Sequence, residues 1–119
     1  MDTTNDNHRT EVIHMNKTGF SKKEFMGCYV HYDNNGTRTG ISKPGFSGSF
    51  VHYDEYNNIT GHSNPGVFGG YVHYDADNNL TGRSDLAPGG GYFHYDSNGC
   101  KTGHSVKAPL DGYIHYEID

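Results

Sequence analysis

Five histidines recur at one fixed interval and carry most of the side-chain chemistry that this sequence offers. The dipeptide His-Tyr returns every 21 residues, and an acidic residue follows each histidine two positions later. The histidines are His31, His52, His73, His94 and His115. Imidazole and carboxylate groups are common ligands of zinc, nickel and copper. If neighbouring copies stack in register, this row of histidines could bind divalent metal ions between the copies.

The same histidines also have a structural interpretation. In a simple hairpin the first four would lie opposite the threonines of a recurring Thr-Gly dipeptide, namely Thr39, Thr60, Thr81 and Thr102. An imidazole–hydroxyl hydrogen bond repeated along the sheet would explain both residue types. We favour this interpretation, so no cofactor is expected, and a bound divalent metal ion is the alternative.

An aromatic residue stands two positions before each of the five histidines. These residues are Tyr29, Phe50, Tyr71, Tyr92 and Tyr113. Residues two apart on an extended strand share a face, so the aromatic side chains and the histidines lie on the same side. An exposed aromatic stripe would be a binding surface for a protein or a sugar. With only 32% hydrophobic residues in the chain, burial in a core is the favoured alternative.

The sequence does not predict an enzyme. Serine, histidine and aspartate recur equally in every copy, whereas an active site needs one asymmetric arrangement of nucleophile, base and orienting group. The sequence contains no Gly-x-Ser-x-Gly elbow, phosphate-binding loop or His-Glu-x-x-His motif.

The elements that position these residues are tandem repeats of 21 residues. Thr-Gly recurs with the same step as His-Tyr, and a serine follows each of those glycines two positions later. We place the copies near 11–27, 28–48, 49–69, 70–90, 91–111 and 112–119. Together they form one predicted domain over residues 11–119, preceded by a polar segment, residues 1–10, that we expect to be mobile.

Each copy has the pattern of a β-hairpin. Residues 29–33 alternate as a strand does, with Val30 and Tyr32 on the face that we expect to form the core. Asp33-Asn34-Asn35-Gly36 then fits a type I turn closed by a residue in the left-handed conformation. Glycine and asparagine tolerate that conformation best, and they occupy the position in all four turns: Gly36, Asn57, Asn78 and Gly99.

A single hairpin is marginal in water, so the copies must stack on one another. The sequence predicts an all-β fold of tandem β-hairpin repeats stacked as an open array or solenoid. The alternative is a closed ring or barrel of hairpins, because the two ends of the chain carry complementary half-copies. In that arrangement strand 113–118 would pair with segment 17–21. Open ends would instead expose edge strands, which promote self-association.

The segments YDADNNLTGRSD, HYDNNGTRTG and HYDSNGCKTG resemble the tyrosine–aspartate (YD) repeats of bacterial Rhs-type and insecticidal toxin-complex proteins. The resemblance spans about residues 28 to 117 and implies hairpins stacked into a spiral sheet. The histidine before the tyrosine and the Thr-Gly-x-Ser after the turn depart from the family's pattern. The chain is also far too short to enclose a cargo, so the resemblance implies no toxin or catalytic activity.

Charge and hydropathy exclude several classes of partner. Nine basic residues against fourteen acidic ones, a net charge of −5, exclude a nucleic-acid-binding protein. No apolar run approaches the roughly 18 residues of a membrane span, so no membrane insertion is expected. No signal peptide is visible, which gives a cytoplasmic location by default.

These observations predict a non-enzymatic β-repeat protein that binds a protein partner or self-associates through edge strands. A bacterial or phage-encoded binding, inhibitor or scaffold protein would fit this description. The first alternative is a metal-binding repeat protein that uses the histidine row. The second is a module that binds a carbohydrate or another surface ligand through its tyrosines and asparagines.

Overall fold

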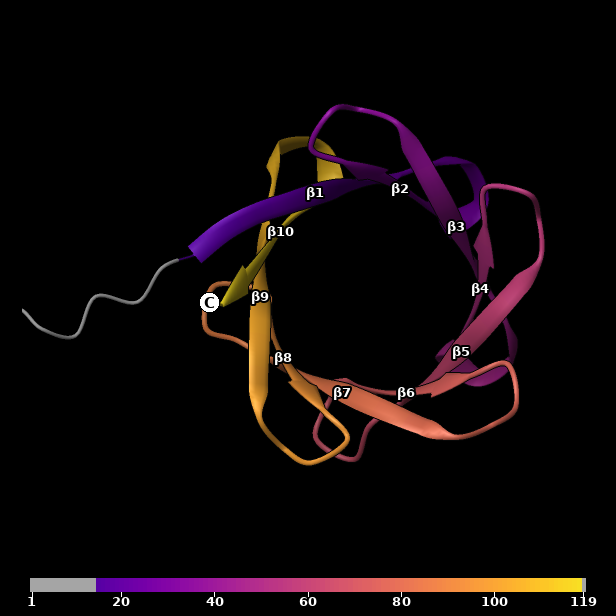
Figure 1. Ribbon diagram of the computed structural model, residues 1–119, viewed down its shortest axis with the longest axis vertical. Coiled ribbons are helices and arrows are strands. Elements are labelled where there is room, and N and C mark those ends of the chain that lie inside the picture. Colours follow the sequence, from indigo (N-terminus) through magenta and orange to yellow (C-terminus); the bar gives the residue numbers. More distant parts are fainter. Residues whose placement is uncertain (1–14, 119) are drawn as a thin grey trace, which may run out of the picture.

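Ten antiparallel strands close into a barrel in the computed structural model, which describes residues 15–118 (Figure 1). The strands are β1 (Met15–Lys23), β2 (Tyr29–Asp33), β3 (Arg38–Pro44), β4 (Phe50–Asp54), β5 (Ile59–Pro65), β6 (Tyr71–Asp75), β7 (Leu80–Leu86), β8 (Tyr92–Asp96), β9 (Lys101–Lys107) and β10 (Tyr113–Ile118). Each strand pairs with its neighbours in sequence, and β1 also pairs with β10. The predicted segment 1–10 lies outside the described residues.

The pairing of β1 with β10 decides between the two predicted architectures. Lys17 lies opposite Tyr116 and Ser21 opposite Tyr113, so the two half-copies complete a hairpin-like pair across the ends of the chain (Figure 1). The closed barrel is therefore confirmed, and the open array is wrong. The physical reason is that every described strand gains two hydrogen-bonded neighbours, which removes the edges that an open array exposes.

The four hairpin turns share one hydrogen-bonding pattern. Asp33 accepts hydrogen bonds at its side-chain oxygen from the backbone N–H groups of Asn35 and Thr37, and the aspartates of the other turns do the same. The closing residues have positive φ angles: Gly36 82°, Asn57 68°, Asn78 68° and Gly99 85°. The aspartates two residues after the histidines thus stabilise the turns.

A β-bulge corrects the predicted pairing within each hairpin. The register shifts between His31 and Tyr32, so His31 lies opposite Gly40 and not opposite Thr39. The same shift occurs between β4 and β5, β6 and β7, and β8 and β9. The predicted histidine–threonine bonds are therefore wrong. The threonine hydroxyls, where they are bonded, donate instead to the backbone carbonyls of the histidines, as Thr60 does to His52 at 3.3 Å.

The predicted core face points outward. Val30 and Tyr32 lie half-buried on the outside, while Tyr29 and His31 face the lumen. The outer tyrosines are covered by the side chain opposite on the next strand, as His62 covers Tyr74 with a centroid distance of 5.0 Å. A ten-stranded barrel is too wide for small side chains to fill, so the larger aromatic and imidazole rings occupy its interior.

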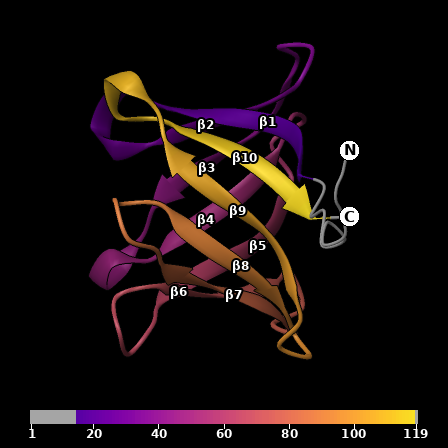
Figure 2. The same ribbon diagram turned by 90° about the vertical axis from the view of Figure 1, so that its left-hand side faces the viewer.

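The loops between hairpins gather at one end of the barrel, and the tight turns lie at the other (Figure 2). Three loops contain short 3-10 turns: η2 (Phe25–Gly27), η3 (Phe46–Gly48) and η4 (Pro109–Asp111). Within residues 15–118, no helix is long and apolar enough to cross a membrane.

Candidate functional site

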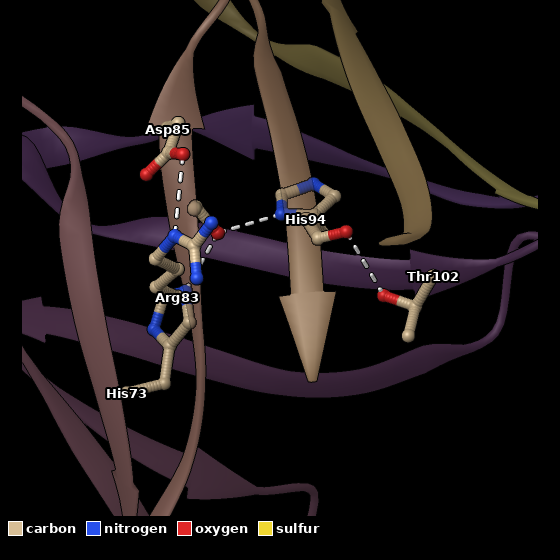
Figure 3. A network of polar contacts seen from close by, with 6 residues as sticks. His73, Arg83, Asp85, His94 and Thr102 are labelled. Atoms are coloured by element: carbon tan, nitrogen blue, oxygen red, sulfur yellow. Dashed lines mark hydrogen bonds and ion pairs between the residues drawn. The ribbon is translucent and has the colours of Figure 1, made fainter. Parts of the chain in front are cut away.

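Five histidines and five serines form one closed ring of hydrogen bonds inside the barrel. Each serine oxygen lies 2.5–2.6 Å from Nδ1 of one histidine and 2.6 Å from Nε2 of another. In order, the ring reads Ser21, His31, Ser42, His52, Ser63, His73, Ser84, His94, Ser105 and His115, and then returns to Ser21. Figure 3 shows His73 on β6 and His94 on β8, the strands on either side of β7.

The strand register places each serine between two histidines. Ser42 on β3 lies directly opposite His52 on β4, and on its other side it lies opposite Tyr29, two residues from His31. The bulge produces this offset, because it moves the serine strand by one residue relative to the histidine strand. The five serines are the most buried polar residues of the described chain, with 2–4% of their surface exposed.

The ring is balanced in donors and acceptors. A neutral histidine has one N–H donor and one acceptor nitrogen, and a serine has one O–H donor. Five of each supply ten donors for the ten hydrogen bonds. When all five histidines are neutral, all ten bonds exist together only if the five have the same tautomer, and every donor of the ring is then used. A charged histidine would add an eleventh donor, so one serine would accept two bonds and its own O–H would have no acceptor in the ring.

The environment of the ring keeps its histidines neutral. Burial, and after it the charge of a neighbouring histidine, lowers the pKa of His31, His52 and His73 to about 4. The pKa of His115 is likewise about 4, and that of His94 is lowered for the same reasons. At neutral pH the ring is therefore uncharged, which is the state in which every donor of the ring has an acceptor.

The five aromatic side chains form a second closed ring, on the side of the histidines that faces the interhairpin loops. Neighbouring ring centroids of Tyr29, Phe50, Tyr71, Tyr92 and Tyr113 are 5.7–6.0 Å apart. The interplanar angles of 48–66° are typical of tilted and edge-to-face contacts. We call this set the aromatic pentagon. Burial, together with the neighbouring tyrosines, raises the pKa of Tyr92 to about 12, so its hydroxyl stays protonated.

A cavity of about 180 Å³ lies in the lumen and is lined by both rings. The imidazole nitrogens and serine oxygens of the histidine–serine ring bond to one another, so they offer few free polar groups to the cavity. The wall is therefore largely carbon, from imidazole and aromatic rings. Sequence reasoning predicted the histidines and the aromatic residues but missed the serines as their partners, although the 21-residue step of the serines was the available signal.

The histidines that were predicted to bind metal lie together in the ring, with their nitrogens already hydrogen-bonded. Both nitrogens of each histidine are hydrogen-bonded to serine, and the following aspartates are bonded in the turns. Among residues 15–118, no three His, Cys, Asp or Glu side chains are placed to hold one metal ion.

The Ser–His contacts resemble a nucleophile and its base, but the rest of a catalytic arrangement differs. The second nitrogen of each histidine contacts another serine and not an orienting carboxylate. Each serine oxygen lies between two imidazole nitrogens.

Large apolar side chains project from four of the five interhairpin loops. We call these residues the loop crown: Phe25, Met26, Phe46, Val67, Phe68 and Leu110, with 79–94% of their surface exposed. They surround the end of the barrel nearest the aromatic pentagon, since Tyr29 and its equivalents follow directly after the loops. The repeat pattern did not predict the crown because the loop residues vary between copies, although an apolar residue after Pro-Gly in two loops was a signal.

No known protein family, curated protein or solved structure matches this chain. The resemblance to tyrosine–aspartate repeats therefore stays a prediction. The function is proposed from the two rings and the loop crown alone.

Proposed function

We propose that the protein is a non-enzymatic binding protein that holds part of a small organic ligand in its barrel lumen. The observation that supports this proposal is a cavity of about 180 Å³ encircled by five aromatic side chains. Ligand sites are typically concave, largely apolar and already formed before the ligand arrives. The cavity lies below the usual range of roughly 300–1,000 Å³, which favours a ligand or ligand group of few atoms.

The aromatic pentagon is well suited to hold such a group without reorganising. Each ring contacts two neighbours in the pentagon, and its backbone is fixed in the barrel by hydrogen bonds on both sides. Rings that are already ordered lose little conformational entropy when a ligand binds. The closure of the barrel also pairs the end strands, so self-association through free edges loses its structural basis among the described strands.

A thermal-shift screen of small organic compounds tests the proposal. We expect a binding compound to raise the melting temperature of the wild type but not that of Tyr71→Leu, which removes one wall of the pentagon. The matched control is Tyr74→Leu on the same strand, because Tyr74 faces outward and stacks on His62. A compound that raises the melting temperatures of Tyr71→Leu and of the wild type equally binds outside the lumen. A screen in which every stabilising compound behaves in this way would contradict lumen binding.

The loop crown favours a second function, docking onto an apolar surface of a protein partner. Met26 and Leu110 have positive φ angles of 62° and 68°, a conformation that is unfavourable for such residues. Burial of the side chains does not offset this backbone strain, because Met26 and Leu110 are 79% and 94% exposed. Apolar residues held in this way are typical of interaction sites rather than of stability.

A triple variant tests the docking function. Phe46→Ser, Phe68→Ser and Leu110→Ser together should abolish binding to a partner that the wild type co-purifies with in a defined complex. Tyr71→Leu should leave that complex intact, because the lumen is not part of the crown. A complex that survives the triple variant would exclude the crown as its interface, and light scattering would identify a second copy of the chain as the partner.

A further inference from the structure

We propose that the loop crown binds the surface of a lipid bilayer that contains negatively charged headgroups. The crown side chains would enter the apolar layer just beneath the headgroups, and lysines behind them would contact the phosphates. This inference goes beyond both proposed functions, because a bilayer is neither a ligand of the lumen nor the surface of a protein. Three observations support it: the exposure of the crown side chains, the fixed shape of the loops, and the charges at the two ends of the barrel.

The crown side chains project into solvent one by one from loops 21 residues apart, which is why the sequence shows no long apolar run. They are 79–94% exposed, so they have little contact with one another or with the barrel. Among residues 15–118, no aromatic ring contact involves Phe25, Phe46 or Phe68. A protein interface packs its side chains into one complementary patch, whereas the apolar layer of a bilayer is fluid and accepts separate side chains. The exposure therefore favours a bilayer.

The loops hold the crown in a fixed shape. One backbone hydrogen bond of 2.6–2.9 Å closes each loop, and its N–H groups belong to Glu24, Gly45, Gly66, Ala87 and Ala108. The three residues inside each bonded pair form a tip, and all five tips lie at the same end of the barrel (Figure 2). A backbone that is already ordered loses little conformational entropy on binding. Asp111 is the one charged residue among the fifteen at the tips, so insertion would remove little charge from water.

The two ends of the barrel differ in charge. At the loop end, Glu24 and Asp111 are outnumbered by four exposed lysines: Lys22, Lys23, Lys43 and Lys107. The third carboxylate at this end, that of Asp85, pairs with Arg83 at 3.2 Å. The turn end has three basic residues against seven acidic ones, which are Asp33, Asp54, Glu55, Asp75, Asp77, Asp96 and Glu117. An anionic surface would therefore attract the loop end and repel the turn end.

Two of the four lysines stand at the rim of the barrel. Lys23 and Lys107 are the last residues of β1 and β9, directly before the loops, and neither forms an ion pair with a described residue. Lys22 and Lys43 place their ammonium groups against tyrosine rings of the outer wall, 5.6 and 4.8 Å from the centroids. Lys23 and Lys107 are therefore the residues that we expect to contact the headgroups.

Sedimentation of the intact protein with vesicles tests the inference. Mixed phosphatidylglycerol–phosphatidylcholine vesicles should bind at least about tenfold more tightly than phosphatidylcholine vesicles, and salt should weaken the binding. Lys23→Gln combined with Lys107→Gln should weaken it at least about tenfold, and Asp111→Asn should strengthen it, because that change removes the negative charge at a tip. Absence of sedimentation with either kind of vesicle would overturn the inference. Equal binding to both kinds would also overturn it.

Apolar variants locate the contact on the crown. Phe46→Ser, Phe68→Ser and Leu110→Ser together should weaken vesicle binding at least about tenfold. These side chains are 92–94% exposed, so the variant keeps the fold. The matched control is Tyr56→Ser, which removes a 77% exposed aromatic side chain at the turn end and should leave the binding unchanged. Unchanged binding of the triple variant would overturn the assignment to the crown.

An introduced tryptophan reports insertion directly, since the sequence contains none. With the mixed vesicles, the fluorescence of Phe68→Trp should shift to shorter wavelength, and brominated phospholipids should quench it. The fluorescence of Tyr56→Trp, at the turn end, should do neither. Sedimentation of Phe68→Trp without quenching would overturn insertion of the crown.

The outcomes separate a bilayer from a protein partner. If the wild type does not sediment with vesicles while the triple variant loses a protein complex, the bilayer inference fails and docking onto a protein stands. If the wild type sediments and the triple variant does not, the bilayer is the surface that the crown binds. Tyr71→Leu should leave vesicle binding unchanged, so ligand binding in the lumen is tested independently.

Discussion

At the scale of single residues, the serines of the ring are the most informative side chains. Each one satisfies two imidazole nitrogens in a largely apolar lumen, and an unpaired buried polar group destabilises a fold by about 1–3 kcal/mol. The sequence showed that the serines recur, but their role depended on a one-residue bulge that no local pattern identifies. The aromatic and histidine positions were predictable, because strand alternation alone puts them on one face.

Ser63→Ala should reduce the free energy of unfolding by about 2–5 kcal/mol, because it leaves Nε2 of His52 and Nδ1 of His73 without partners. The matched control is Thr60→Ala, which loses a single exposed bond of 3.3 Å to a backbone carbonyl and should cost less than about 1 kcal/mol. Urea denaturation of both variants measures the difference. Equal losses would show that the ring does not stabilise the barrel.

Acid should destabilise the protein over the pH range that is set by the pKa values of the ring histidines. Their pKa is 6.5 in the unfolded chain and about 4 in the barrel, so between these values the unfolded chain binds more protons. Stability is thus complete above pH 6.5 and is lost as the pH falls toward 4, by about 1.4 kcal/mol per pH unit for each histidine in this range. Urea unfolding at several pH values measures the slope. His52→Gln should make it shallower, and a flat profile would contradict the neutral ring.

At the scale of elements, the hairpin is the unit that the sequence specifies most completely. Alternation, the Asp–Asn turn and the left-handed position all follow from local chemistry. The glycine that recurs two residues before each serine is different, because the backbone atom that requires a glycine there lies on another strand. A Cβ atom added at Gly61 would lie 2.1 Å from the carbonyl oxygen of Tyr74, so the backbones could not approach as they do. Contacts between strands of different copies cannot be deduced from one copy alone.

Gly61→Ala should therefore be strongly destabilising, by about 3 kcal/mol or more, because the clash is with backbone and not with a flexible side chain. Gly66→Ala is the control, since its nearest neighbour would be at 3.4 Å and the residue lies in a loop. The control should change stability by less than about 1 kcal/mol. Thermal unfolding followed by circular dichroism compares the two, and similar melting temperatures would contradict the close approach of the strands.

At the scale of the whole molecule, closure depends on the number of copies. The complementary half-copies at residues 15–23 and 113–118 showed that a ring was available, but the curvature that joins them is a property of ten strands together. The contact that closes the barrel, Ser21 with His115, has the same length as its equivalents within the complete copies, such as Ser63 with His52. The curvature and the width of the lumen could therefore not be predicted from the sequence, although the proposed binding in the lumen depends on them.

Deletion of residues 113–119 should convert the protein into a self-associating species. It removes β10, exposes the edges of β1 and β9, and opens the hydrogen-bonded ring between Ser105 and Ser21. Light scattering should detect oligomers of the shortened chain, whereas the intact protein should remain monomeric. A shortened chain that stays monomeric and unfolds with the same midpoint would show that closure contributes nothing.

The hydrogen bonds of the serine–histidine ring all run in one direction around the barrel. Its donors point either all clockwise or all anticlockwise around the barrel axis, and these two states differ only in the positions of ten protons. No single histidine can reverse by itself, since a reversed member would face donor against donor on one side and acceptor against acceptor on the other. The five copies, alike in sequence, must therefore agree on one orientation. A ligand that prefers one state at a single histidine would set the orientation of the histidine on the far side of the barrel, with no movement of the backbone between them.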